Sequence, residues 1–132
     1  MARPAPTHPT DAELKILNVL WRRGSGTLRE IHEALQPRHK TALTTTLKTL
    51  QIMTHKGLVL RDTTASPSRY TPARPEAKTQ ANLTKDLIQK AFEGSASLLL
   101  VRLCENGGLS DRELQDIRKL IDGIRKQKRG DK

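Results

Sequence analysis

The residues best suited to specific chemistry lie between Lys40 and Lys56, a stretch in which cations and threonines gather. No carboxylate occurs between Glu33 and Asp62. Ammonium and hydroxyl groups bind phosphate oxygens, and short hydroxyl side chains can also meet base edges and thymine methyl groups. The polar side chains of the stretch are Lys40, Thr41, Thr44, Thr45, Lys48 and Gln51. Their chemistry predicts a polyanionic partner.

A helix over residues 40–56 would present these side chains together. Leu43, Leu47, Leu50 and either Met53 or Thr54 recur at helical spacing, so an apolar stripe can lie on a core while the polar side stays exposed. Gly57 follows as a candidate left-handed C-cap. We therefore predict a DNA recognition helix, with a solvated, threonine-rich helix face as the alternative for this segment alone.

The charge distribution agrees with a polyanionic partner. The 132 residues carry a net charge of +10. Residues 1–75 hold 12 Lys and Arg against 5 Asp and Glu, a net +7, whereas residues 76–124 hold 7 against 8, a net −1. Only three aromatic residues are present, and single-strand or RNA binders stack bases on aromatic side chains. Duplex DNA is the favoured partner.

Two helices are predicted before this stretch. Prolines make residues 1–9 a flexible leader, and Thr10 and Glu13 have the spacing of a capping box that opens a helix ending at Gly24. Trp21 is assigned to its buried face. Thr27 and Glu30 repeat the box and open a helix to Leu35, although Thr27 and Leu28 could equally form a very short strand.

A β-hairpin is predicted after Gly57. Residues 58–62 change to strand composition, 63–68 form a polar turn, and 69–71 can return antiparallel. Three helices followed by a hairpin give the order of a winged helix-turn-helix, here over residues 10–74. Arg61, Ser66, Ser68 and Arg69 would lie in the wing, with Arg69 our candidate for DNA contact.

Three further helices are expected over residues 75–125, so the fold class is mainly α. The segment 96–104 is apolar nearly all round, and Ser110 and Glu113 form a third capping box. About 50 residues of this kind cannot close a core alone, which predicts a homodimerisation domain. The proposed interface residues are Leu99, Leu103, Leu114, Ile117 and Ile121. Residues 126–132 are expected to be a basic flexible tail.

The sequence offers little support for a disulfide-bonded protein, a membrane protein, a metal-binding protein or an enzyme. The single cysteine, Cys104, excludes an internal disulfide, favours the cytoplasm and is expected to be a small buried hydrophobe. No apolar run is long enough to insert in a membrane. The histidines lack zinc spacing, and neither a phosphate-binding loop nor a nucleophile motif occurs, so we predict no metal site, no cofactor and no enzyme activity.

Several short segments carry a family pattern by their order and spacing over about residues 8–125. They are Thr10-Asp11-Ala12-Glu13-Leu14, Trp21, Thr27-Leu28-Arg29-Glu30-Ile31, Thr44-Thr45-Thr46-Leu47, Lys56-Gly57-Leu58-Val59, Gly94-Ser95, Ser97-Leu98, Leu109-Ser110 and Glu113-Leu114. Together they resemble the BlaI/MecI/CopY-type penicillinase repressors. The resemblance implies a winged-helix domain, a helical dimerisation domain and repression at palindromic operators.

The chain departs from that family in two places. Copper-responsive members have clustered cysteines near the C-terminus, whereas Cys104 stands alone. β-Lactam-responsive members are cut by a membrane sensor protease at an Asn-Phe bond in the helix matching residues 95–106, and the nearest counterpart here is Val101-Arg102. We therefore expect a homodimeric repressor released by disruption of the dimer, with a sequence-nonspecific nucleoid-associated protein as the alternative.

Overall fold

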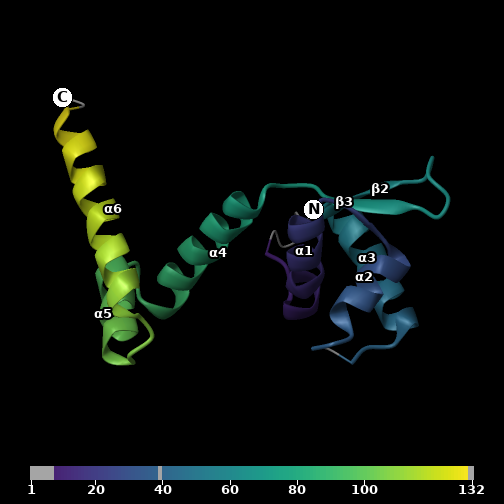
Figure 1. Ribbon diagram of the computed structural model, residues 1–132, viewed down its shortest axis with the longest axis horizontal. Helices are drawn as coiled ribbons and strands as arrows, with labels where there is room; N and C mark the ends of the chain where they lie inside the picture. Colours follow the sequence, from purple (N-terminus) through teal and green to yellow (C-terminus); the bar gives the residue numbers. More distant parts are fainter. Residues whose placement is uncertain (1–7, 39, 131–132) are drawn as a thin grey trace, which may run out of the picture. The chain divides into compact units, whose positions relative to one another are not determined.

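The computed structural model describes residues 8–38 and 40–130 (Figure 1). The chain divides into two compact units, Met1–Thr84 and Lys85–Lys132. Residues 1–7 of the expected leader, and His39, lie outside the described residues.

The first unit begins with three helices, α1 (Asp11–Arg23), α2 (Leu28–Leu35) and α3 (Leu43–Lys56). The capping boxes that open α1 and α2 form as predicted: Thr10 N–H donates to Glu13 Oε1 at 2.9 Å, and Thr27 N–H donates to Glu30 Oε1 at 3.0 Å. The start of α3 differs from the prediction. It begins at Leu43 after Ala42, which offers no side-chain cap, so Lys40 and Thr41 precede the helix.

A three-stranded antiparallel sheet completes this unit. Its strands are β1 (Gly26–Thr27), β2 (Val59–Asp62) and β3 (Arg69–Pro72), in the order β1-β3-β2. Thr27 lies in β1 and also caps α2, so both alternatives for this residue are realised. Gly57 ends α3 with φ 80°, as predicted, and β2 and β3 with their loop, residues 59–72, form the wing.

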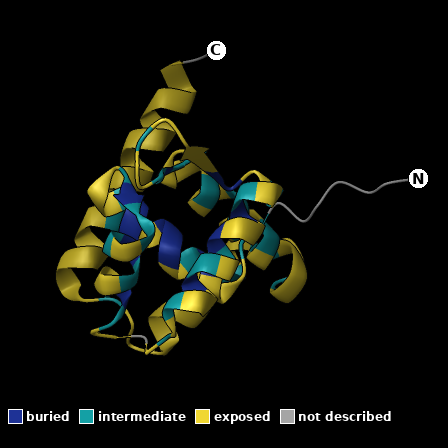
Figure 2. Cartoon of the chain, turned by 90° about the vertical axis from the view of Figure 1, so that its right-hand side faces the viewer, coloured by how far each residue is buried: buried dark blue, intermediate teal, exposed yellow. Residues whose placement is uncertain are grey.

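All buried hydrophobic side chains among the described residues belong to the first unit (Figure 2). They are Ile16, Leu17, Val19, Leu20, Ile31, Leu35, Leu50, Met53, Leu58, Val59 and Tyr70. Trp21 packs against this core, and its Nε1–H donates to the Arg74 carbonyl oxygen at 3.1 Å. The predicted stripe of α3 is only partly right, because Leu43 and Leu47 are half-buried while Thr46 is 1% exposed.

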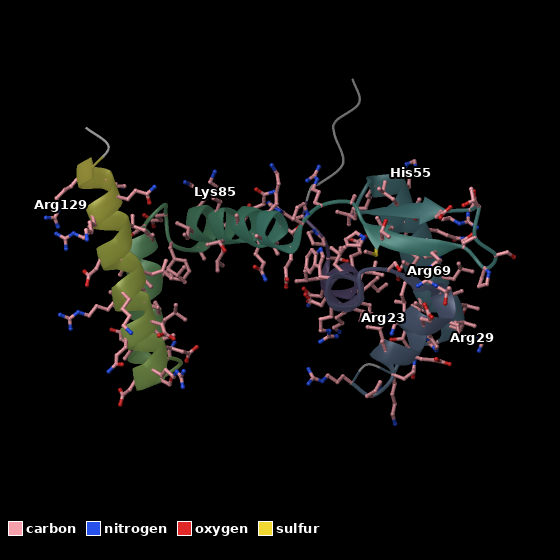
Figure 3. The ribbon with its side chains drawn as sticks, turned by 45° about the horizontal axis from the view of Figure 1, so that its top comes forward. Arg23, Arg29, His55, Arg69, Lys85 and Arg129 are labelled. Carbon is pink, nitrogen blue, oxygen red and sulfur yellow. The ribbon has the colours of Figure 1, made fainter. Side chains whose placement is uncertain are left out.

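The second unit contains the end of α4 (Glu76–Ala91), α5 (Ala96–Glu105) and α6 (Asp111–Gly130). Figure 3 labels Lys85, at its start, and Arg129, near its end. Ser95 caps α5, and Ser110 and Glu113 form the third predicted box. The tail predicted from residue 126 is helical as far as Gly130, because nothing in residues 125–129 breaks a helix and cations suit its last turn.

No described residue of the second unit is buried in the single chain. Eight of the ten exposed large hydrophobics lie in it: Leu87, Leu100, Val101, Leu103, Leu114, Leu120, Ile121 and Ile124. The burial expected for 95–106 is therefore absent within one chain, and Cys104 is exposed, contrary to expectation, because no other element covers it. None of the described helices is both long and apolar enough to span a membrane.

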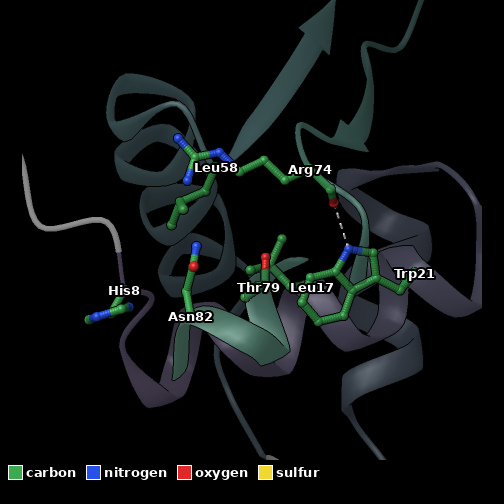
Figure 4. Close-up of a pocket in the computed structure, with 7 residues that line it drawn as sticks. All are labelled: His8, Leu17, Trp21, Leu58, Arg74, Thr79 and Asn82. Atoms are coloured by element: carbon green, nitrogen blue, oxygen red, sulfur yellow. Dashed lines mark hydrogen bonds between the residues drawn. The ribbon is translucent and has the colours of Figure 1, made fainter. Parts of the chain in front are cut away.

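The division between the units falls inside α4 rather than at Pro75. Thr79 and Asn82 of α4 line a small cavity with Leu17, Trp21 and Leu58 of the first unit (Figure 4). The cavity of about 10 Å³ has room for one water at most. The first half of α4 thus packs with the preceding residues.

A buried ion pair joins α1 to α3. Lys56 Nζ, at the end of α3, lies 2.7 Å from Glu13 Oε1, and the two side chains are 14% and 4% exposed. Burial raises the pKa of Glu13, but hydrogen bonds from Lys56 and Thr10 outweigh it, so the pKa lies below the ordinary 4.5. The charged carboxylate is therefore the form that the fold stabilises.

We expect Glu13→Gln to destabilise the first unit by about 2–3 kcal/mol near neutral pH, less than the loss of a fully buried pair because Lys56 keeps some contact with solvent. The stabilising effect of a lowered pKa is complete above the unfolded value and is lost as pH falls through the folded value. The difference between wild type and variant should therefore shrink below about pH 4.5. Urea unfolding followed by the fluorescence of Trp21, the only tryptophan, measures this difference in the free energy of unfolding.

The exposed carboxylate Glu33 provides the control. Glu33→Gln should leave the unfolding midpoint nearly unchanged. If the difference in the free energy of unfolding between the wild type and Glu13→Gln does not change with pH, the charge of Glu13 does not have the assigned role.

Candidate nucleic-acid interface

The exposed side of α3 carries the side chains singled out from the sequence. Thr44, Lys48 and Gln51 lie at positions i, i+4 and i+7 and are exposed, and Thr45 is exposed beside them. Lys40, which is exposed, and Thr41, which is half-buried, lie just before the first turn of the helix. Four of the six candidates thus share one helix face, and two extend it at the N-terminal end.

The threonines of α3 divide into two groups. The hydroxyls of Thr46 and Thr49 donate to the carbonyl oxygens of Ala42 and Thr45, at 3.4 and 2.9 Å. Such bonds to the preceding turn satisfy the hydroxyl inside the protein. In the described part of the chain, the hydroxyls of Thr44 and Thr45 have no hydrogen-bond partner. These two are free to bind a ligand.

A side-chain network that the sequence did not reveal holds the turn before α3. Gln36 Nε2 donates to the Thr41 carbonyl oxygen at 2.9 Å and lies 3.1 Å from His32 Nε2. His32 Nδ1 lies 3.0 Å from the buried Thr46 hydroxyl. His32 of α2 therefore holds the first turns of α3, and Gln36, the C-cap of α2, holds the segment that leads into it. The contacting residues lie 14 positions apart for His32 and Thr46 and 5 apart for Gln36 and Thr41, and they form no recognisable motif.

A groove of about 290 Å³ separates α3 from the wing. Its walls come from the start of α2, the first turns of α3 and the wing, and its lining residues are Thr27, Leu28, Arg29, Leu43, Leu47, Arg61, Pro67, Ser68 and Tyr70. Leu43 and Leu47 are half-buried because they form this wall instead of reaching the core. Arg29 and Arg61 are exposed cations at the groove, and Arg29 was missed from the sequence because its helix showed no other cation.

Arg69, the predicted wing contact, is held by the body of the domain. Its NH2 donates to Ser25 Oγ at 3.0 Å and lies 3.4 Å from Glu30 Oε1, which is also 3.4 Å from Arg23 (Figure 3). The backbone N–H of Thr27 is the largest influence lowering the pKa of Glu30, and Arg69 and Arg23 add to it. Arg69 therefore ties β3 to the start of α2, with its side chain 39% exposed.

The cations at this surface are available for an anionic ligand. Among the described residues, Lys40, Lys48, Arg29 and Arg61 form no ion pair, whereas Lys56 is committed to Glu13. A cationic helix face with free hydroxyls, beside a groove flanked by two arginines, can bind phosphates and reach base edges. Within the same residues, no group of three His, Cys, Asp or Glu side chains could hold a metal ion.

The fold and this surface define a winged helix-turn-helix, in which the third helix is the element that enters the major groove of duplex DNA. Residues 9–123 match the penicillinase repressor family. The transcriptional regulator BlaI of Mycobacterium tuberculosis, in strains CDC 1551 and H37Rv, is 32% identical over 105 residues, which cover 78% of this chain and 76% of the relative. The chain belongs to the penicillinase repressor family and is a transcriptional repressor of the BlaI type.

Solved structures give further similarities. The DNA-binding domain of the repressor BlaI aligns with a TM-score of 0.47 and 24% identity, covering 58% of this chain and 92% of that one. The reduced form of MarR from Escherichia coli aligns with a TM-score of 0.47 and 16% identity, covering 88% of this chain and 77% of that one.

Lys48→Ala should weaken binding to every duplex alike. Removal of one phosphate contact should reduce the slope of log K against log salt concentration by about 0.9 for each subunit bound. Fluorescence anisotropy with labelled duplex over a range of salt concentrations measures this slope. Lys90, paired with Asp86 on α4, is the matched lysine, and Lys90→Ala should leave the slope unchanged. An unchanged slope for Lys48→Ala would remove this residue from the interface.

Proposed function

We propose that this repressor acts as a homodimer that binds palindromic operator DNA, with α3 in the major groove and the wing against the adjacent backbone. The observation that carries the proposal is the exposed face of α3 and the segment just before it, which together hold Lys40, Lys48 and free hydroxyls and no carboxylate. Homodimers place two equivalent helices on two equivalent half-sites, which accounts for a palindromic target.

Different side chains would provide the affinity for DNA and the sequence specificity. Lys40, Thr41 and Lys48 would bind phosphates, which positions the helix without selecting a sequence. Thr44 and Thr45 would meet base edges or thymine methyl groups. Arg69 would act through the wing, because its link to Glu30 sets the position of β3 and its exposed part still faces solvent.

The exposed apolar side chains of α5 and α6 support a second copy as the dimer partner. Leu103, Leu114 and Ile121 are 38%, 42% and 42% exposed, and Leu99 and Ile117 are half-buried. On α6, Leu114, Ile117 and Ile121 recur at intervals of three and four residues, which places them on one face. Exposed apolar side chains in this number are normally covered in a folded protein.

Release would follow from separation of the subunits. Joining two DNA-binding domains makes the second contact intramolecular and raises the apparent affinity by roughly 10²–10⁴. A membrane sensor protease that cut near Val101 and Arg102, both exposed on α5, would separate the first unit from α6. A nicked protein that stayed dimeric with unchanged operator affinity would exclude this route.

The choice between an operator-specific repressor and a nonspecific DNA-packaging protein rests on Thr44 and Thr45. Each substitution to alanine should cost on the order of 1–3 kcal/mol on the operator and much less on random duplex. Binding of both duplexes at equal salt gives the comparison. Thr49→Ala is the control, because the Thr49 hydroxyl is bonded within the helix. Equal affinity of the wild-type protein for both duplexes would favour the packaging protein.

Ile117→Asp should dissociate the dimer, because it would place an unpaired charge in the proposed interface. Light scattering should give the mass of one chain. The affinity for the operator should fall by roughly 10²–10⁴, the gain expected from joining two DNA-binding domains. Leu60, 60% exposed on β2, is the matched apolar residue, and Leu60→Asp should leave the dimer intact. A monomeric variant with full operator affinity would show that dimer separation is not the release step.

A further inference from the structure

The C-terminal end of α6 is a cationic helical segment that the proposed repressor mechanism does not use. Residues 125–130, here called the basic arm, contain Arg125, Lys126, Lys128 and Arg129 and no carboxylate. All of them are exposed and helical. By contrast, residues 111–124 of the same helix hold 3 Lys and Arg against 4 Asp and Glu, a net −1. The positive charge is therefore confined to the final turns.

The basic arm does not continue the proposed dimer interface. The apolar positions of α6 end at Ile124, and the next position of the repeat is occupied by Lys128. A lysine at this position would bury an unpaired charge if the interface extended this far. In Figures 1 and 3 the last turns of α6 extend beyond α5, the shorter helix of the same unit.

The described part of the chain does not neutralise the charges of the arm. Among the described residues, none of its four cations forms an ion pair or a side-chain hydrogen bond. Within the helix the nearest carboxylate is Asp122, about one turn earlier, and Asp131 follows in the sequence outside the described residues. Four free cations within about 9 Å of helix form a dense positive surface.

We propose that the basic arm is a second contact for duplex DNA, made to phosphates outside the bases that α3 reads. The inference rests on the proposed function, because the partner is the DNA that α3 binds. Duplex DNA carries about one negative charge per 1.7 Å of its axis, which matches a dense row of cations better than isolated phosphate groups do. An anionic membrane fits less well, since surface-bound helices also insert an apolar face and the arm has no apolar side chain.

The arm would therefore add affinity for DNA without adding sequence specificity. The arm would strengthen binding to operator and random duplex equally and would steepen the dependence on salt. Because its residues are fixed in a helix, less ordering is required on binding than for a flexible tail.

The test compares full-length variants in the duplex-binding assay. The quadruple variant R125Q/K126Q/K128Q/R129Q should reduce the slope of log K against log salt concentration by about 2–4 per subunit, since each lost phosphate contact contributes about 0.9. Affinity at low salt should fall at least tenfold on both duplexes. R112Q/R118Q/K119Q, which removes three cations flanked by carboxylates on the same helix, should leave the slope unchanged.

Further measurements exclude indirect effects. The charge-preserving variant R125K/R129K should bind as the wild type does, and light scattering should give the quadruple variant the wild-type mass. Loss of binding by R125K/R129K, a changed mass of the quadruple variant, or equal slopes for the quadruple variant and the wild type would each overturn the proposal. So would a quadruple variant that loses only its binding to phosphatidylserine vesicles.

Failure of the arm can be distinguished from failure of the proposed function. If Lys48→Ala lowers the slope while the quadruple variant does not, the arm is rejected and the role of α3 stands. If the wild type shows no preference for operator, operator-specific repression is rejected, whereas a slope lowered by the quadruple variant would still support the arm.

Discussion

The ion pair between Glu13 and Lys56 fixes the geometry on which the proposed DNA-binding surface depends. Glu13 closes the capping box of α1 and accepts from the ammonium group at the end of α3, so one carboxylate secures the start of one helix and the end of another. A buried charge is tolerated only when it is paired and hydrogen-bonded, which ties the two helix ends to each other. The Gln36 and His32 contacts hold the opposite end of α3. The helix is thus anchored at both ends while its outer face remains free.

The threonine content of α3 has two separate physical causes. Thr46 occupies a core position that the predicted apolar stripe did not include, and its hydroxyl is tolerated there because Ala42 and His32 provide partners. Thr49 and Thr54 bond to the preceding turn. Only Thr44 and Thr45 remain as candidates for base contact. An unusual composition in a sequence therefore mixes structural and functional residues that only side-chain geometry separates.

The sequence predicted the elements where a local rule decides the structure. The three capping boxes, Gly57 and the wing strands follow from short-range spacing, and all were confirmed. The predictions from the sequence were wrong or incomplete where tertiary contacts determine the structure. The start of α3 lacks a capping residue, Leu43 and Leu47 line a groove, and the contacts of Glu30 with Arg69 and of Glu13 with Lys56 join residues 39 and 43 positions apart. The helical end of α6 was missed because its basic composition resembles that of a disordered tail.

The two units differ in what they require to be stable, and this difference fits the proposed mode of regulation. The first unit buries eleven hydrophobic side chains within one chain, whereas no described residue of the second unit is buried. A unit that gains its burial from a second copy has a stability that depends on protein concentration. Under the proposed mechanism, a change in α5 or α6 would act on dimerisation without unfolding the DNA-binding unit. The second unit would then control the affinity for the operator through dimerisation, while the first unit would read the bases. The two tasks can be separate because the first unit is stable within one chain and the second depends on a partner copy.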